Sequence, residues 1–245
     1  MKVSSKTYTI GKTVYPRVTT VIGKYGSEYL LNWAVDETVN HIDREITPLA
    51  KTKPHEIKYV LPTVLKTAKN RHEIIKRTAG DRGTEIHTLI EKKLKGNKIP
   101  KTYDEEEHLQ KILKNVDKWV DDWGFTPSTF VDEMGITHKS IELTVRSETY
   151  GYAGTVDLIG TTKDNQTILA DIKTGKTTRK TMEAQMAAYA MAWTEMGGTR
   201  PDLCFVLHVL PSGNLKEKHI LDPPAYQKRF DEFLGLLKFY KAFGD

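Results

Sequence analysis

Two aspartates and a lysine near the middle of the chain have the types and spacing needed for metal-dependent chemistry on a phosphate ester. Asp157 lies in one predicted strand, and Asp171 and Lys173 lie in the next. Side chains two residues apart in a strand project from the same face, so Asp171 and Lys173 share one. The turn between the strands is short enough to make them antiparallel neighbours. The sequence therefore predicts two carboxylates and an amine at one place.

Carboxylates this close together favour a divalent cation. Two adjacent carboxylates repel and share a proton, and a hard cation with oxygen ligands, such as Mg²⁺ or Mn²⁺, removes that penalty. The cation can lower the pKa of a coordinated water and neutralise phosphate charge. Lys173 can orient or help to deprotonate that water, which requires the pKa of its amine to fall. The alternative is an ordinary ion pair between Asp171 and Lys173 on a solvated strand.

This pattern resembles the motif of the PD-(D/E)xK nuclease superfamily, in particular its RecB-like branch. The branch has five elements in order: a helical histidine, a glutamate on a strand, a strand aspartate, Asp-x-Lys, and Gln-x-x-x-Tyr on the next helix. In this chain they correspond to His87, Glu142, Asp157, the stretch Asp171-Ile172-Lys173, and the pair Gln185 and Tyr189. The superfamily's nominal proline before the first aspartate is Val156 here, a departure that removes no chemical group.

The resemblance implies a fold, a cofactor and a reaction. The fold is α/β, a restriction-endonuclease-like α/β/α core with a mixed central sheet and an N-terminal, mainly helical extension. One or two Mg²⁺ or Mn²⁺ ions would be held by His87, Asp157, Asp171 and the backbone carbonyl of Ile172. Catalysis of phosphodiester hydrolysis would rest on Asp157, Asp171, Lys173 and Glu142. Lys173 would position and activate the attacking water, and Glu142 would sit near the metal.

Five residues after the Asp-x-Lys motif are candidates for contact with DNA. Gln185 and Tyr189 are four residues apart on one helix face, where the resemblance implies contact with the nucleic-acid backbone or with the catalytic groups. Core packing in this alanine-rich helix is the alternative. Lys176, Arg179 and Lys180 follow the catalytic strand, and the resemblance places them at the mouth of the site. A solvated turn is the alternative for these three.

Charge is unevenly distributed along the chain. Residues 1–100 carry 19 Lys/Arg against 10 Asp/Glu, whereas residues 101–245 carry 18 against 22. The first part therefore suits a polyanion such as nucleic acid. Tyr25, Tyr29 and Trp33 are candidates for stacking on unpaired bases, although core packing is the alternative for Trp33.

The periodicity of the sequence predicts a helical front followed by a sheet. A hairpin occupies the first twenty residues, and a helix begins at residue 27. Pro48, Pro54 and Pro62 are expected to break the chain into short pieces. The remaining elements are helices at 64–75, 84–95, 104–123, 181–196 and the C-terminus, and strands at 129–134, 139–146, 152–159, 167–173, 203–210 and 215–220. Two domains follow: a basic, mainly helical region, 1–80, forming part of the DNA path, and a nuclease core, 81–245.

The N-terminal sequence extends the resemblance. The stretch from Tyr15 to Ile22, followed by Leu31-Asn32-Trp33, is similar to the opening of the mitochondrial genome maintenance exonuclease and related phage exonucleases. This similarity implies an exonuclease acting on single-stranded DNA or open ends, in the cytoplasm of a bacterial or phage-infected cell. A structure-specific or flap endonuclease of the same fold, and a non-catalytic nucleic-acid-binding module, remain as alternatives.

Composition excludes several other classes. With one cysteine, Cys204, among 245 residues, the chain cannot form an internal disulfide or bind an iron–sulfur cluster through cysteines. The longest apolar run has eight residues, 186–193, so we expect no membrane association through a spanning helix. The sequence contains no helicase motif, and any unwinding would come from a helicase or recombination partner.

Overall fold

The chain folds into two compact units. The structure is a computed structural model, and it describes all residues except 5, 24–26, 101–105, 132–134, 176–178 and 244–245. One unit comprises Met1–Lys24 and Glu85–Asp245, and the other comprises Tyr25–Thr84. The N-terminal hairpin thus groups with the sheet, whereas the sequence prediction placed it with the helical region.

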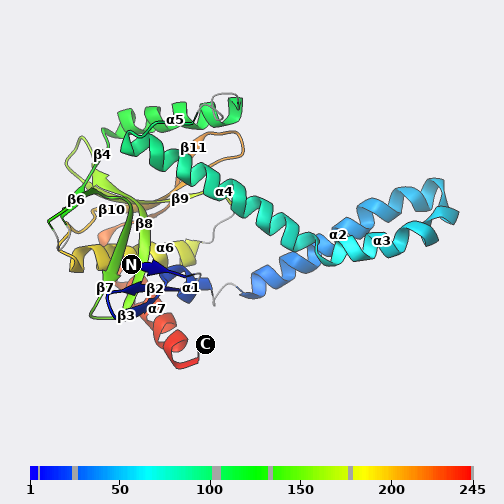
Figure 1. Cartoon of the computed structure of the whole chain (residues 1–245), viewed down its shortest axis with the longest axis horizontal. Helices are drawn as coiled ribbons and strands as arrows, with labels where there is room; N and C mark the ends of the chain where they lie inside the picture. Colours follow the sequence, from blue (N-terminus) through cyan, green and yellow to red (C-terminus); the bar gives the residue numbers. More distant parts are fainter. Residues whose placement is uncertain (5, 24–26, 101–105, 132–134, 176–178, 244–245) are drawn as a thin grey trace. The chain divides into compact units, whose positions relative to one another are not determined.

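A six-stranded mixed sheet is the centre of the larger unit (Figure 1). Its strands run in the order β11-β10-β9-β8-β4, and β7 also pairs with β8. Only β9 and β10 are parallel among these pairs; the others are antiparallel. The strands are β4 (Thr126–Pro127), β7 (Ile141–Ser147), β8 (Tyr152–Thr161), β9 (Thr167–Lys173), β10 (Leu203–Val209) and β11 (Leu215–Leu221).

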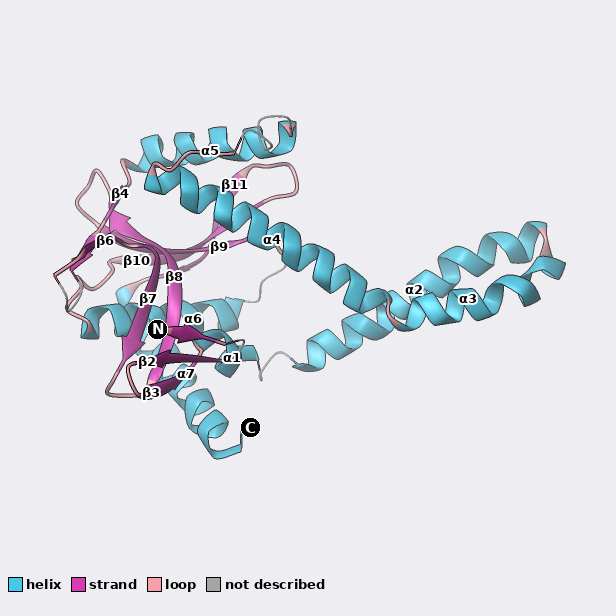
Figure 2. Ribbon diagram, viewed as in Figure 1, coloured by secondary structure: helices cyan, strands magenta, loops and turns pink. Residues whose placement is uncertain are grey.

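Helices cover both faces of this sheet, as Figure 2 shows. Successive residues of β9 point to opposite faces: Ala170 packs with Leu89 and Ile112 on one side, and Leu169 packs with Ala188 on the other. The α/β/α restriction-endonuclease-like fold predicted from the sequence is therefore confirmed. The first side is covered by residues 85–95 of α4 (Arg71–Lys95) and by α5 (Glu107–Trp123), and the second by α1 (Val18–Gly23), α6 (Arg179–Glu195) and α7 (Pro223–Phe243).

The smaller unit is helical, and two of its three prolines lie inside helices, whereas the third, Pro54, begins a new one. Its elements are α2 (Ser27–Thr52), the short 3₁₀ helix η1 (Pro54–Glu56), α3 (Ile57–Lys69) and the start of α4. Pro48 lies inside α2 and Pro62 inside α3, so the predicted breaks at these prolines are wrong. Each proline removes one backbone hydrogen bond, but α2 and α3 support each other. For example, Thr38 Oγ1 donates to the carbonyl of Ala68 at 3.4 Å.

Helix α4 is longer than the sequence predicted. The expected helix at 64–75 is divided at Asn70, and α4 then continues through Gly80 and Gly83 instead of starting after them. A glycine in a helix costs about 1 kcal/mol relative to alanine. Burial of apolar side chains further along α4, such as Leu89, offsets that cost.

Two smaller sheets complete the larger unit. β1 (Lys2–Val3), β2 (Thr7–Ile10) and β3 (Thr13–Pro16) form one, and Tyr8 from β2 hydrogen-bonds Thr155 of β8 at 2.7 Å between hydroxyl oxygens. β5 (Thr129–Val131) and β6 (Thr137–Lys139) form the other; the end of the strand predicted at 129–134 falls outside the described residues. Across the described part of the chain, no helix combines the length and apolarity needed to cross a membrane.

Candidate metal-binding and catalytic site

Asp157 lies where β8 and β9 stop pairing. The ladder between the two strands ends with the pair Leu158 and Ala170. Two residues further along β9, the N–H of Ile172 donates to Oδ2 of Asp157 at 2.5 Å. The aspartate side chain thus takes the place of a backbone acceptor, and this bond fixes Asp157 against the centre of the Asp-x-Lys motif.

Asp171 is buried and held by two side chains. Gln185 Nε2 on α6 donates to Asp171 Oδ1 at 2.6 Å, and Lys173 Nζ forms an ion pair with Asp171 Oδ2. Lys173 Nζ also lies 3.3 Å from the carbonyl oxygen of Ile172, to which it donates. Asp171 and Lys173 therefore share a face, as the sequence predicted, and α6 supplies the group that orients the carboxylate.

Glu142 of β7 faces Asp157 across the strand pair. The register pairs Ile141 with Leu158 and Leu143 with Val156, which leaves Glu142 opposite Asp157. Like charges directly opposite each other are destabilising in a sheet. Glu142 also has a φ of 53°, in the left-handed region that non-glycine residues rarely adopt. Such strain persists where surrounding structure imposes it, and it is concentrated at functional sites.

His87 reaches the same point from α4. Its Nδ1 lies 3.6 Å from Oδ2 of Asp157 and 3.9 Å from Oε1 of Glu142. One ligand atom from each of these three residues lies within 4.8 Å of the other two. Residues from α4, β7 and β8 thus converge on one small volume.

The carboxylates are in an electrostatically costly position. Burial, followed by the charge of Asp171, raises the pKa of Asp157 to about 8. Burial acts in the opposite direction on His87, but Glu142 and Asp157 outweigh it, so the pKa of the imidazole is raised. Protons therefore compensate for part of the negative charge at neutral pH.

The pKa of the Lys173 amine is raised, whereas the catalytic role suggested from the sequence requires it to fall. Burial lowers the pKa of Lys173, but the charges of Asp171 and Asp157 outweigh burial and raise it. The amine is consequently an ammonium that donates hydrogen bonds in this arrangement. A fall in its pKa requires another positive charge to offset these carboxylates.

The donor set fits a divalent cation. Carboxylate oxygens suit Mg²⁺ and Mn²⁺, and imidazole is an acceptable donor to the latter. The group that converges is His87, Glu142 and Asp157, whereas Asp171 is engaged by Gln185 and Lys173. The predicted ligand set of His87, Asp157, Asp171 and the carbonyl of Ile172, with Glu142 near the metal, stays a prediction.

Gln185 and Tyr189 are buried under the sheet. Gln185 Nε2 lies 3.3 Å from the hydroxyl of Tyr189, in addition to its bond with Asp171. The ring of Tyr189 lies against Gly154 of β8, where an added Cβ would come within 2.3 Å of a ring carbon. Burial, followed by the charges of Asp171 and Asp157, keeps the pKa of Tyr189 far above its ordinary value, so the phenol stays protonated. Gln185 therefore contacts Asp171 directly, whereas Tyr189 contacts Gln185 and packs in the core.

Three basic residues after β9 were predicted to contact DNA. Lys176 and the side chain of Arg179 lie outside the part of the chain that the structure describes, and Lys180 is exposed in the first turn of α6. Their predicted contact with DNA stays a prediction.

Several supporting residues were not singled out from the sequence. Gly154 leaves space for the ring of Tyr189, and a glycine inside a strand was the available signal. Arg17 bridges to Ala153 of β8 through the backbone, and its guanidinium carbon lies 5.3 Å from the ring centroid of Tyr8. No local pattern in the sequence connects Tyr8 of β2, or Arg17 just after β3, to β8.

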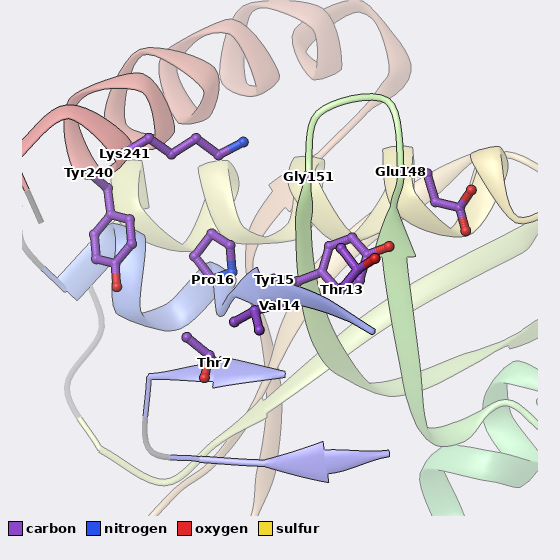
Figure 3. A pocket seen from close by; sticks show the side chains of 9 residues that line it. All are labelled: Thr7, Thr13, Val14, Tyr15, Pro16, Glu148, Gly151, Tyr240 and Lys241. Carbon is purple, nitrogen blue, oxygen red and sulfur yellow. The ribbon is translucent and has the colours of Figure 1, made fainter. Parts of the chain in front are cut away.

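A pocket of about 570 Å³ lies elsewhere in the same unit (Figure 3). The residues that line this pocket come from the N-terminal hairpin, the turn between β7 and β8, and the end of α7. They are Thr7, Thr13, Val14, Tyr15, Pro16, Glu148, Gly151, Tyr240 and Lys241. None belongs to the converging group, and Lys241 Nζ is engaged by the carbonyl of Tyr150 at 2.7 Å.

Together, the fold and the site define a restriction-endonuclease-like protein with an acidic, metal-compatible centre at the end of its strand pair. The model of the PD-(D/E)XK nuclease superfamily matches residues 56–238, so the chain belongs to that superfamily. Its members are nucleases that use divalent metals, which agrees with the donor set described above.

Comparison with curated proteins and with solved structures gives no match in the first case and a distant one in the second. No curated protein matches the sequence. A solved structure described as "Crystal structure of SSO0001" matches with 15% identity and a TM-score of 0.28, covering 86% of this chain and 85% of the other.

Proposed function

We propose that this protein is a Mg²⁺- or Mn²⁺-dependent deoxyribonuclease that hydrolyses phosphodiester bonds. The observation that carries the proposal is the convergence of His87, Glu142 and Asp157 beside the ion pair of Asp171 and Lys173. A group of acids with a neighbouring amine suits hydrolysis of an anionic ester once a cation is present.

Each residue has a distinct part in this reaction. His87, Glu142 and Asp157 would hold the cation, which would supply the positive charge that acidifies a water and offsets charge on the phosphate. Lys173 Nζ, fixed by Asp171, would position the attacking water. The charge of a bound cation would offset the carboxylates, so the ammonium would release its proton to solvent and the free amine would then accept the proton of that water. Gln185 orients Asp171, and through it Lys173.

We further propose that the substrate is single-stranded DNA or DNA with open ends, and that the protein acts as an exonuclease. Support comes from the five motif elements of the RecB-like branch and from the N-terminal likeness to mitochondrial and phage exonucleases. Under this proposal residues 1–80 form part of the DNA path, with Lys176, Arg179 and Lys180 near its mouth. A helicase or recombination partner supplies any unwinding, in the cytoplasm of a bacterial or phage-infected cell.

The test is cleavage of end-labelled linear single-stranded DNA beside covalently closed circles, each with Mg²⁺, Mn²⁺ or EDTA. We expect metal-dependent loss of the linear strand and survival of the circles. Asp171→Asn and Lys173→Ala should reduce cleavage more than about 100-fold, while binding of DNA persists. Lys228→Ala, on the exposed side of α7, is the matched lysine control and should cleave normally.

Other outcomes separate the alternatives. Cutting of the circles would establish an endonuclease of the same fold, and structured flap substrates would then define its preference. Binding without cleavage of linear, circular or flap DNA under any metal condition would establish the non-catalytic module and contradict the proposal.

A further inference from the structure

The outer face of α3 combines an exposed aromatic ring with positive charge. Tyr59 is 72% exposed, and Lys58 Nζ lies 4.8 Å from the centroid of its ring. Lys66 and Lys69 are exposed further along the helix. The helix contains no aspartate or glutamate, so nothing within it neutralises the three lysines.

Helix geometry places these residues together on the side away from the packed stripe. Val64 and Ala68 are the buried residues of α3. Tyr59 and Lys66 are seven residues apart, which is close to two turns, so they lie on the same face about 10 Å apart along the axis. Lys58 and Lys69 lie three turns apart on an adjoining line. We call Lys58, Tyr59, Lys66 and Lys69 the α3 face.

Charge within the helical unit is polarised. α2 carries five Asp/Glu against two Lys/Arg, whereas residues 57–84 carry seven Lys/Arg against two Asp/Glu. A polyanion is therefore attracted to α3 and the start of α4 and repelled from α2. Among the residues that the sequence suggested for stacking, Trp33 is partly buried, and Tyr25 and the side chain of Tyr29 lie outside the described residues.

We propose that the α3 face binds single-stranded DNA, with Tyr59 stacking on an unpaired base and the lysines contacting phosphates. An exposed aromatic ring among cations is the combination by which proteins hold single strands without sequence preference. Bases of a duplex are already stacked on each other, so the ring favours a single strand. The inference rests on the proposed function, since it names how the substrate of that site is held.

The first test measures binding separately from cleavage. Fluorescence polarisation would compare fluorescein-labelled oligo(dT) with an abasic strand of equal length, in EDTA and in the Asp171→Asn background. Tyr59→Ala should weaken oligo(dT) binding about 10-fold and leave the abasic strand unchanged, because only oligo(dT) offers a base to stack on. Tyr59→Trp should retain tight binding, and Phe239→Ala, at another exposed ring, should have no effect.

The second test concerns the lysines. Lys66→Gln combined with Lys69→Gln should weaken binding of both strands. It should also flatten the dependence of log K on log salt by about 0.7 for each phosphate that the lysines no longer neutralise. Unchanged salt dependence would show that Lys66 and Lys69 do not contact phosphates of the bound strand.

The inference is overturned if Tyr59→Ala binds oligo(dT) as tightly as the parent. It is equally overturned if the substitution weakens binding of the abasic strand as much as binding of oligo(dT). It is also overturned if the parent binds neither strand. Hydrolysis of bis(p-nitrophenyl) phosphate, a diester without a base, tests the catalytic site independently and should be unchanged by Tyr59→Ala. This hydrolysis is measured in chains that keep Asp171, and its failure there would count against the proposed function, while the binding measurements would still test the α3 face.

Discussion

Gln185 Nε2 donates a hydrogen bond of 2.6 Å to Oδ1 of Asp171, and both side chains are buried. The amide comes from α6 and the carboxylate from β9, so the bond joins the helix to the strand that carries Asp-x-Lys. Because Asp171 also pairs with Lys173, the orientation of the amine depends on the same contact.

Replacing Gln185 tests this dependence. Gln185→Leu leaves Oδ1 of Asp171 buried without its donor, and we expect metal-dependent cleavage to fall about 10- to 100-fold, the usual cost of losing a group that orients a metal-site residue. Steady-state cleavage of labelled DNA would measure it. Gln227→Leu is the matched control, because Gln227 makes the same kind of bond to Asp231 at 2.7 Å on an exposed face of α7. Equal activity of the two variants would contradict the role assigned to Gln185.

Gly154 should be intolerant of a side chain. A Cβ at this position would come within 2.3 Å of Tyr189 Cε1, so Gly154→Ala forces the buried ring to move. We expect the free energy of unfolding to fall by about 1–3 kcal/mol, as for other overpacked cores. Urea unfolding followed by circular dichroism would measure it. Gly235→Ala on α7, where nothing lies within 4 Å, should instead be neutral or stabilising.

Metal affinity should depend on pH through Asp157. Its pKa of about 8 lies above the ordinary 3.8, so the folded protein keeps a proton that the unfolded chain loses. Without metal, this group's contribution to stability is therefore lost as pH rises from about 4 toward 8. A cation must displace the proton, so Mn²⁺ affinity should rise with pH up to about 8. Calorimetry in buffers of different ionisation enthalpy would measure the released proton, and affinity that is flat from about pH 6 to 8 would contradict this account.

The single cysteine should report on unfolding. Cys204 Sγ is buried at 3.0 Å from the hydroxyl of Tyr226, and burial raises the pKa of the thiol to about 12. Since the thiolate is the reactive form, Ellman's reagent should react only when the structure opens. The reaction rate should increase with urea in step with unfolding. Rapid stoichiometric labelling in native buffer would show that β10 is more accessible than its packing indicates.

The sequence by itself determined several local elements and the spacing within the motif. β9 occupies residues 167–173 as predicted, because a short apolar run after a turn suits a strand buried on both faces. The apolar stripe that includes Ile112 and Val116 predicted α5, because its residues recur with the helical period. These features depend on neighbours within a few residues, which a sequence shows directly.

Tertiary structure decided what the site residues touch. The register of β7 and β8 placed Glu142 opposite Asp157, and α4 brought His87 within 3.6 Å of Asp157. Packing of α6 turned Tyr189 into the core. The direction of the Lys173 pKa shift also depended on tertiary structure, because it is the balance of burial against carboxylates from two strands. Such balances are set by distances between elements far apart in the chain, which spacing within the sequence does not contain.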